Sequence, residues 1–278
     1  MKPIIDACGI HHAAAGRGAR IICLVPSITE LLFDLDLGQY VVGRTSFCIH
    51  PASSVATVQR VGGTKTVRLD RIAALNATHV IVNIDENRRE DADALRQMGL
   101  HIIATHPNEP SDNAALYQLI GALFDREGQA QALCKRFAVA LDALREQTRS
   151  MPRQRVLYLI WRDPWMSVSS ATYIARMLAT AGMDVVDAHA TDVDENAAAT
   201  RYPKITIDSA LLARVDRVLL SSEPYPFKES HRRELEALGG SNSPPVAFID
   251  GEMTSWYGSR AIVGCEYLAQ LRTEHFAQ

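Results

Sequence analysis

Short runs of apolar residues alternate along the chain with longer segments in which apolar residues recur at steps of three and four. Runs of this length, rich in Val, Ile and Leu, predict buried strands, and the longer spacing predicts amphipathic helices. The predicted strands are residues 20–25, 41–43, 79–82, 101–104, 156–160, 185–186, 217–220 and 246–249, and the predicted helices include 69–75, 88–98 and 172–181. Alternating strands and helices predict parallel sheets with crossover connections, so the fold class is α/β.

A helix is also predicted to begin directly after the first strand and to run to Gly38. Ser27 and Glu30 have the spacing of a capping box, in which Ser27 accepts a hydrogen bond from the Glu30 amide while Glu30 reaches back to the amide of the capping residue. The sequence therefore predicts a capping box at this helix start.

The longest helical pattern covers residues 129–148, where Leu133, Phe137, Leu141 and Leu144 repeat on one face. A helix of this length extends roughly 30 Å, about the width of a small domain. We therefore expect two Rossmann-like lobes with mostly parallel sheets, joined by one long backbone helix. The expected division is an N-terminal tail (1–19), an N-terminal lobe (20–127), the connecting helix (128–150) and a C-terminal lobe (151–278).

Composition fits a globular protein with two separate cores, because 47% of the 278 residues are hydrophobic and 22% are charged. A net charge of -3 without basic clusters argues against nucleic-acid binding. Five widely separated cysteines indicate a reducing compartment. Residues 1–19 contain no continuous apolar stretch of a secretory signal, and no run reaches the roughly 18 apolar residues of a membrane span, so the expected location is the cytoplasm, with the periplasm as the alternative.

The three tryptophans follow predicted strands instead of lying inside them. Trp161 and Trp165 come after 156–160, and Trp256 comes after 246–249; the segment after 217–220 adds two more rings, Tyr225 and Phe227. In open α/β sheets, ligands bind beyond the carboxyl ends of the strands. The pattern therefore predicts a ligand pocket, whereas the alternative is that these rings are half-buried lids over the protein's own core.

Several segments resemble one family of receptors. They are Arg-Ile-Ile-Cys-Leu-Val-Pro-Ser-Ile-Thr-Glu-Leu-Leu at 20–32, Leu-Gly-Gln-Tyr-Val-Val-Gly-Arg at 37–44, Val-Gly-Gly-Thr at 61–64 and Leu-Asp-Arg-Ile-Ala-Ala-Leu at 69–75. The chain resembles, over about residues 20–270, the class III solute-binding proteins, the helical-backbone receptors that deliver cobalamin, haem or ferric siderophores to ABC importers. It looks closest to the cobalamin-binding branch, and segments 160–166, 221–228 and 250–260 are similar to members of that branch without export signals.

The resemblance implies that a corrinoid or related metal chelate is held between the lobes by aromatic side chains, since rings match a broad planar ligand at low entropic cost. The implied ligand-binding positions are Phe47, Thr64, Asn83, Trp161, Trp165, Tyr202, Tyr225, Trp256, Tyr257 and Arg260. Thr64 and Asn83 depart from the cobalamin binder, where tryptophans are expected, and this shifts the aromatic contacts to the second lobe. For Arg260 the alternative is a salt bridge at a helix start.

The resemblance also implies docking to a permease, because importer-coupled members present one acidic residue on each lobe. These positions fall at Asp70 and Asp208, which are aspartates where the family usually has glutamates. Each lies where a helix should begin, so the alternative is an N-cap or a first-turn charge that is favourable to the helix dipole.

No catalytic or metal-binding motif emerges from the sequence. The histidines near strand ends lack partners at metal-ligand spacing, although His50 or His106 could serve as an axial ligand to the metal of a chelate. The neighbouring carboxylates Asp85 and Glu86 are typical of a solvated loop. We therefore expect a non-enzymatic binding protein with no catalytic cofactor and possible delivery to an ABC permease; the alternative is a cytoplasmic enzyme or cofactor chaperone of corrinoid or tetrapyrrole metabolism.

Overall fold

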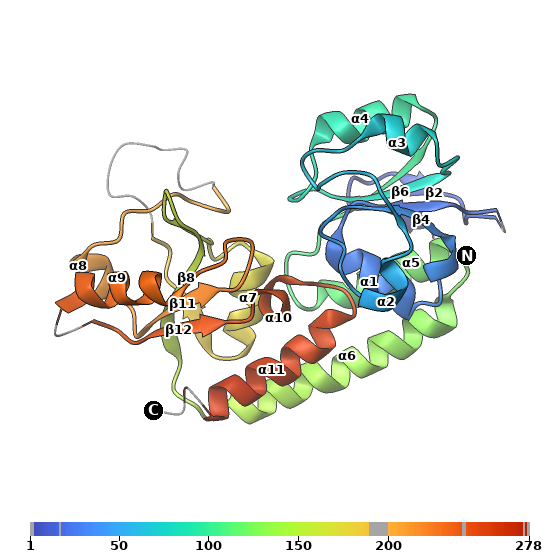
Figure 1. Ribbon diagram of the computed structural model, residues 1–278. Coiled ribbons are helices and arrows are strands. Elements are labelled where there is room, and N and C mark those ends of the chain that lie inside the picture. Colours follow the sequence, from blue (N-terminus) through green and yellow to red (C-terminus); the bar gives the residue numbers. More distant parts are fainter. Residues whose placement is uncertain (1–2, 17, 189–199, 241–242, 275, 277–278) are drawn as a thin grey trace. The chain divides into compact units, whose positions relative to one another are not determined.

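The computed structural model describes residues 3–16, 18–188, 200–240, 243–274 and 276, and it divides into two compact units (Figure 1). Unit 1 comprises Met1–Pro107, Ser111–Ala138 and Tyr257–Arg260, and unit 2 comprises Asn108–Pro110, Val139–Trp256 and Ala261–Gln278. Helix α6 (Glu127–Thr148) begins in unit 1 and ends in unit 2. The predicted class, two α/β lobes joined by one long helix, is confirmed.

Unit 1 is built on a sheet of five parallel strands with β3 in the centre. In sheet order the strands are β5 (Gln59–Arg60), β4 (Val41–Arg44), β3 (Ile21–Cys23), β6 (His79–Asn83) and β7 (His101–Thr105). The unit also contains α1 (Pro26–Asp34), η1 (Gly38–Tyr40), α2 (Ala52–Val55), α3 (Leu69–Ala73), α4 (Arg89–Gln97) and α5 (Asp112–Leu123).

One face of this sheet packs against α3 and α4. Ile22 and Val80 on the strands share a buried cluster with Ile72 of α3 and Leu95 of α4. Each such side chain contributes roughly 1.5 to 3 kcal/mol when it leaves water. Because both faces of the inner strands are buried, groups that must meet a ligand are displaced to the strand ends.

The predicted capping box at α1 is wrong. The N-cap residue is Val25, and no side chain caps the helix. Ser27 lies inside the first turn and is buried, while the Glu30 carboxylate binds Arg260. Proline at the first helical position removes one amide that would otherwise need a partner, so the helix begins without a side-chain cap.

The segment expected to be a tail contains a small hairpin, β1 (Ile4–Ile5) paired with β2 (His11–His12). Its turn is organised by Asp6, whose buried carboxylate accepts hydrogen bonds from the amides of Cys8 and Ile10 and from the amide of Ala104 on β7. The amide of Ala7 donates to the carbonyl of Ala104 in return. Residues 4–12 are thus bonded to the edge strand of unit 1.

Unit 2 has a second parallel sheet in the order β10 (Met183–Val185), β8 (Gln154–Trp161), β11 (Arg217–Ser221) and β12 (Val246–Ile249), with β9 (Met166–Ser167) antiparallel to β8. Its helices are α7 (Tyr173–Thr180), α8 (Ser209–Leu212), α9 (Glu229–Gly239), α10 (Gly251–Ser255) and α11 (Arg260–Glu274). Leu157 and Val218 on the strands pack with Leu211 of α8 and Leu235 of α9.

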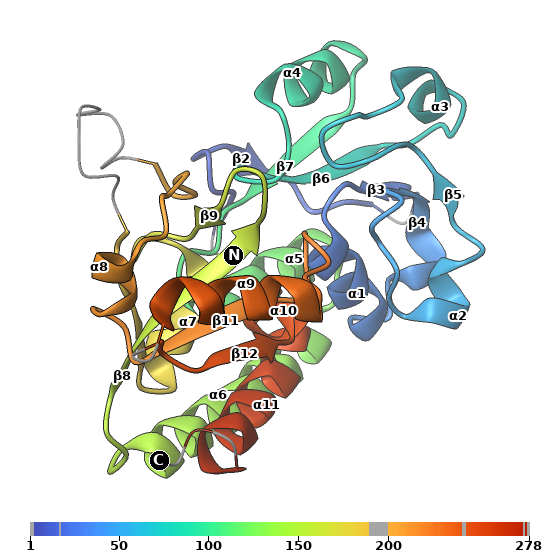
Figure 2. The ribbon, with the colours of Figure 1, turned by 60° about the vertical axis from the view of Figure 1, so that its left-hand side comes forward.

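The second half of α6 lies beside α11 within unit 2, and the two views agree on this arrangement (Figures 1 and 2). The Gln147 side chain donates to the Ala269 carbonyl at 3.4 Å. Leu144 of α6 and Leu268 of α11 are fully buried, so α11 lies along the part of the predicted apolar stripe that belongs to unit 2, whereas Phe137 at the unit 1 end of the stripe packs on Tyr117 of α5.

Asp6→Asn should destabilise the protein by about 2 kcal/mol, because the amide keeps one acceptor oxygen but replaces the other with an NH2 group, which cannot accept, so either the Ala104 amide or the amides of Cys8 and Ile10 lose their acceptor. Urea unfolding measures this change. Asp142→Asn, on an exposed position of α6, is the control and should change the free energy of unfolding by less than about 0.5 kcal/mol. Equal effects of the two variants would contradict a structural role for the hairpin.

The protein should lose stability as the pH falls from 6.5 towards 4, because burial and the neighbouring His101 and His12 lower the pKa of His79 from 6.5 to about 4. In this range unfolded His79 binds a proton and folded His79 does not, so protons favour the unfolded state. His79→Gln should flatten this part of the stability profile, measured by urea unfolding at a series of pH values. An unchanged slope would contradict the assignment.

Candidate functional site

The carboxyl ends of β8 and β11 carry a cluster of rings, which we name the aromatic cluster: Trp161, Trp165, Tyr225, Phe227 and His231. The ring centroids of Trp161 and Tyr225 are 5.4 Å apart, and those of Tyr225 and Phe227 are 4.8 Å apart. Trp165 stacks on Phe227 at 6.0 Å, and His231 lies edge-on to both Tyr225 and Phe227. Two predicted tryptophans, Tyr225 and Phe227, the rings expected at these strand ends, are thus brought together, whereas His231 was not expected among them.

Trp161 is the most open large apolar side chain of this cluster, with 40% of its surface exposed. Trp165 and Phe227 are half-buried against the core below. The guanidinium of Arg162 lies 4.5 Å above the Trp165 ring and is bound in turn by Glu234 of α9 at 2.7 Å. Trp165 therefore contacts both Phe227 and Arg162, whereas a large part of the Trp161 side chain is exposed to solvent.

Trp256 ends α10 and packs inward, with 7% of its surface exposed. Its indole Nε1 donates to Glu223 Oε1 at 2.7 Å, and the Ser255 hydroxyl donates to the same oxygen at 3.0 Å. Burial raises the pKa of Glu223, and the nearby carboxylates of Glu252 and Asp250 add to this effect. The buried Trp256 is therefore bonded, through Glu223, to the loop that carries Tyr225.

Tyr202, the remaining predicted ring of this unit, lies in a segment that runs beside β9. The amide of Ser167 donates to the Pro203 carbonyl and the amide of Ser169 to the Arg201 carbonyl, and Tyr202 is half-buried between these bonds.

In unit 1, three apolar side chains are exposed at the carboxyl ends of strands. Phe47, 59% exposed, and the exposed Ile49 follow β4, and the exposed Ile84 follows β6. Phe47 was predicted; the two isoleucines were missed, because a single apolar residue in a loop is common on any surface.

Asn83 and Thr64, also predicted to face a ligand, take part in the turn after β6. The buried Asn83 accepts hydrogen bonds from the amides of Asp85 and Glu86, at 2.8 and 3.3 Å. Asn87 donates to the Thr64 carbonyl at 3.1 Å and accepts from the Asn83 amide at 2.8 Å. These asparagines shape the loop that presents Ile84.

Residues 257–260 are bonded to unit 1. The hydroxyl of the buried Tyr257 donates to Glu86, and the Gly258 amide and carbonyl bind Asn113 and Tyr117 at 2.7 and 2.8 Å. Gly258 has φ +83°, and a Cβ there would approach the Ser27 carbonyl oxygen to 3.2 Å, so glycine is required. Glu86, interpreted from sequence as part of a solvated loop, is instead half-buried and bonded.

Arg260 forms a two-pronged ion pair with Glu30. Its Nε and Nη2 atoms lie 2.7 and 2.6 Å from the two carboxylate oxygens, and both side chains are mostly buried. This geometry favours the salt-bridge alternative that the sequence left open for Arg260.

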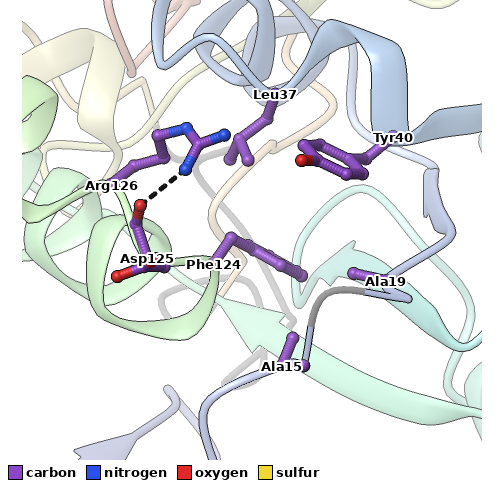
Figure 3. Close-up of a pocket in the computed structure, with 8 residues that line it drawn as sticks. Ala15, Ala19, Leu37, Tyr40, Phe124, Asp125 and Arg126 are labelled. Atoms are coloured by element: carbon purple, nitrogen blue, oxygen red, sulfur yellow. Dashed lines mark hydrogen bonds between the residues drawn. The ribbon is translucent and has the colours of Figure 1, made fainter.

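The cavity shown in Figure 3 is a small hollow of ≈ 80 Å³ in unit 1. Ala15, Leu37, Tyr40, Phe124 and Arg126 are among its lining residues, and Arg126 donates to the Asp125 carbonyl at 2.7 Å. Ala19 and Tyr40 precede β3 and β4, so the hollow lies at the amino ends of the strands. It is also far below the 300 to 1,000 Å³, roughly, of a pocket for a large ligand.

The sequence profile of a family described as "Periplasmic binding protein" matches residues 21–210. The chain belongs to this family. The vitamin B12-binding protein of Vibrio parahaemolyticus is 22% identical over 203 residues, which is 73% of this chain and 70% of that protein. The Yersinia pestis vitamin B12-binding protein is 23% identical over 209 residues, covering 73% and 74% of the two chains.

Solved structures share the fold of this periplasmic binding protein. The periplasmic vitamin B12-binding protein BtuF of Vibrio cholerae has a TM-score of 0.74 at 18% identity, covering 90% of this chain and 95% of that one. The haem-binding protein RhuT from Roseiflexus sp. RS-1, in apo form, has a TM-score of 0.76 at 20% identity, covering 90% and 96%. The resemblance to class III solute-binding proteins is thereby confirmed as a matter of fold.

The two carboxylates predicted to dock a permease differ in their surroundings. Asp70 lies in the first turn of α3, exposed, and pairs with Arg68 at 3.0 Å. Asp208 is the N-cap of α8 and accepts from the Leu211 amide at 2.8 Å. Both positions at helix starts were predicted, and their role in docking stays a prediction.

The described histidines do not form a candidate metal site. His106 lies 3.4 Å from Asp85, and His50 is half-buried before Pro51. Within the described ranges, no group of three His, Cys, Asp or Glu side chains could hold a metal ion. In the same part of the chain, no helix has the length and apolar character needed to cross a bilayer.

Arg260→Ala should lower the free energy of unfolding by about 2 kcal/mol, because it leaves the Glu30 carboxylate mostly buried without its partner. A double-mutant cycle with Glu30→Gln should give a coupling energy above about 1 kcal/mol. Additive effects of the two substitutions would mean that the ion pair does not support the fold and would return Arg260 to the set of ligand-contact candidates.

Proposed function

We propose that this periplasmic binding protein is a non-enzymatic receptor for a corrinoid or a related planar metal chelate. The observation that carries the proposal is the exposure of large apolar side chains at the carboxyl ends of parallel strands. Trp161 of unit 2 and Phe47, Ile49 and Ile84 of unit 1 all occupy such positions. Ligands of open α/β sheets bind at this edge.

The chemistry of these side chains supports a broad, flat and partly apolar ligand. An indole offers a large rigid surface with few rotatable bonds, so little conformational entropy is lost when it stacks on a macrocycle. The relatives named as vitamin B12-binding and haem-binding proteins bind ligands of this shape. In this proposal the chelate is cargo, and the chain needs no catalytic cofactor.

At Thr64 and Asn83 this chain lacks the tryptophans that are expected in a cobalamin binder. This difference supports a ligand other than intact cobalamin. Because Asn83 and Asn87 use their amides to shape the turn, unit 1 offers the aliphatic Ile84 there. Titration of the purified protein with cyanocobalamin, dicyanocobinamide, haemin and a ferric siderophore, followed by tryptophan fluorescence, tests the proposal. Saturable quenching by one of them is expected, and no response to any of the four would overturn the receptor function.

Trp161→Ala should weaken chelate binding by roughly 1 to 3 kcal/mol, a loss of about five- to 150-fold, because an exposed ring at the centre of a contact contributes strongly. The matched control is Phe248→Ala. Phe248 is 43% exposed on β12 of the same unit, close to the 40% of Trp161, but lies in the middle of an edge strand. Equal affinities of the two variants would place the ligand elsewhere.

Delivery to an ABC permease through Asp70 and Asp208 is part of the same proposal. Asp70 is well exposed, and Asp208 is also exposed while its Oδ1 caps α8. The similar proteins BtuF and RhuT, which are periplasmic, support the periplasm as the place of action. Osmotic-shock fractionation of cells tests that location against the cytoplasm.

A further inference from the structure

We propose that Glu223 is a positioning residue, which fixes the loop Ser222–Lys228 to Trp256 and thereby sets the arrangement of the aromatic cluster. The proposal rests on the function proposed above, since it assigns Glu223 to the same ligand face. Glu223 has no expected contact with the ligand; it acts through the rings that follow it.

The start of the loop is bound to the end of β12 and to the start of α10. The Ser222 amide donates to the Ile249 carbonyl at 3.0 Å, and the Ser222 hydroxyl accepts from the Gly251 amide at 2.9 Å. A Cβ at Gly251 would approach Glu223 Cγ to 2.6 Å and Ser221 Oγ to 2.5 Å. Only glycine allows α10 to begin this close to the loop.

Glu223 then makes the contacts that reach Trp256. A single carboxylate oxygen, Oε1, accepts hydrogen bonds from the Trp256 indole and the Ser255 hydroxyl. When the carboxyl is ionised the acceptor is an anion and both donors are neutral, so these bonds are then stronger than bonds to a neutral acceptor. One side chain thus fixes both the end of α10 and the start of the loop.

Tyr225 lies two residues after Glu223 and passes this constraint to the cluster. Its ring contacts Trp161 and Phe227, and Phe227 stacks on Trp165. The far end of the loop is fixed independently, because the amide of Lys228 donates to His231 Nδ1 at 2.8 Å. With both ends bound, the rings between them have little freedom to change their spacing.

The environment of Glu223 makes the constraint sensitive to pH. Burial, with Asp250 and Glu252 nearby, raises the pKa of its carboxyl, so it binds a proton at a higher pH than an exposed glutamate. Protonation removes the charge from the acceptor and weakens both hydrogen bonds. Other titratable or charged groups around the loop are Tyr158, which bonds Ser221, and Arg162 and His231 of the cluster.

The test compares the full-length protein with Glu223→Gln, which keeps the shape of the side chain and removes the charge. The control is Glu236→Gln, a half-exposed glutamate of α9 in the same unit. Two-dimensional NMR of the ¹⁵N-labelled indole groups gives one cross-peak per tryptophan, assigned with single Trp→Phe variants. Affinities for dicyanocobinamide and haemin are measured on the same samples, and thermal unfolding monitors the fold.

In Glu223→Gln we expect the Trp256 and Trp161 cross-peaks to move without ligand, and the affinity for the bound probe to fall about ten-fold or more. The shift of the Trp256 cross-peak with falling pH should disappear in this variant. The control should match the native protein in every measurement.

Two outcomes would overturn the proposal. One is a Trp161 cross-peak that stays in place while Trp256 moves, which would mean that Glu223 does not arrange the cluster. The other is an unchanged affinity in Glu223→Gln. If the native protein binds none of the four chelates, the proposed function fails, whereas the ligand-free spectra still decide whether Glu223 positions the rings.

Discussion

Burial of parallel strands on both faces is the constraint on which the rest of this structure depends. Ile22, Val80, Leu157 and Val218 belong to strands whose side chains are enclosed by helices, so these strands have no free face to offer. Polar and ligand-contact groups must then lie where the strands end. Trp161, Phe47 and Ile84 are exposed large apolar side chains at or just beyond such strand ends.

The same constraint explains which elements could be predicted from sequence. The apolar runs at β6, β7 and β12 are short and dense, and their boundaries were predicted to within one residue. Helix α6 was equally clear because its apolar stripe is long. The hairpin at residues 4–12 could not be predicted, because it depends on the distant Ala104 and on one buried carboxylate.

Local patterns failed where a distant partner competed for the same side chain. Glu30 has the spacing of a capping box, but a guanidinium 230 residues away makes two charge-assisted bonds with it. Trp256 follows a strand in sequence, yet α10 intervenes and turns its indole towards Glu223. Strand ends could be read from the sequence; the directions of their side chains required the tertiary structure.

Rigid support of the exposed rings has a direct consequence for binding. Below the loop, the buried Tyr158 hydroxyl bonds both Ser221 and Thr254, and Ser221 donates to the Glu223 carbonyl at 2.6 Å. Each of these bonds forms when the chain folds, so the cost of ordering the loop is met before a ligand arrives. A ring that is already in place gains the full benefit of stacking, whereas a mobile ring would lose part of it to entropy. In the proposed receptor, the polar contacts beneath the cluster therefore contribute to affinity by holding the apolar surface above them in place.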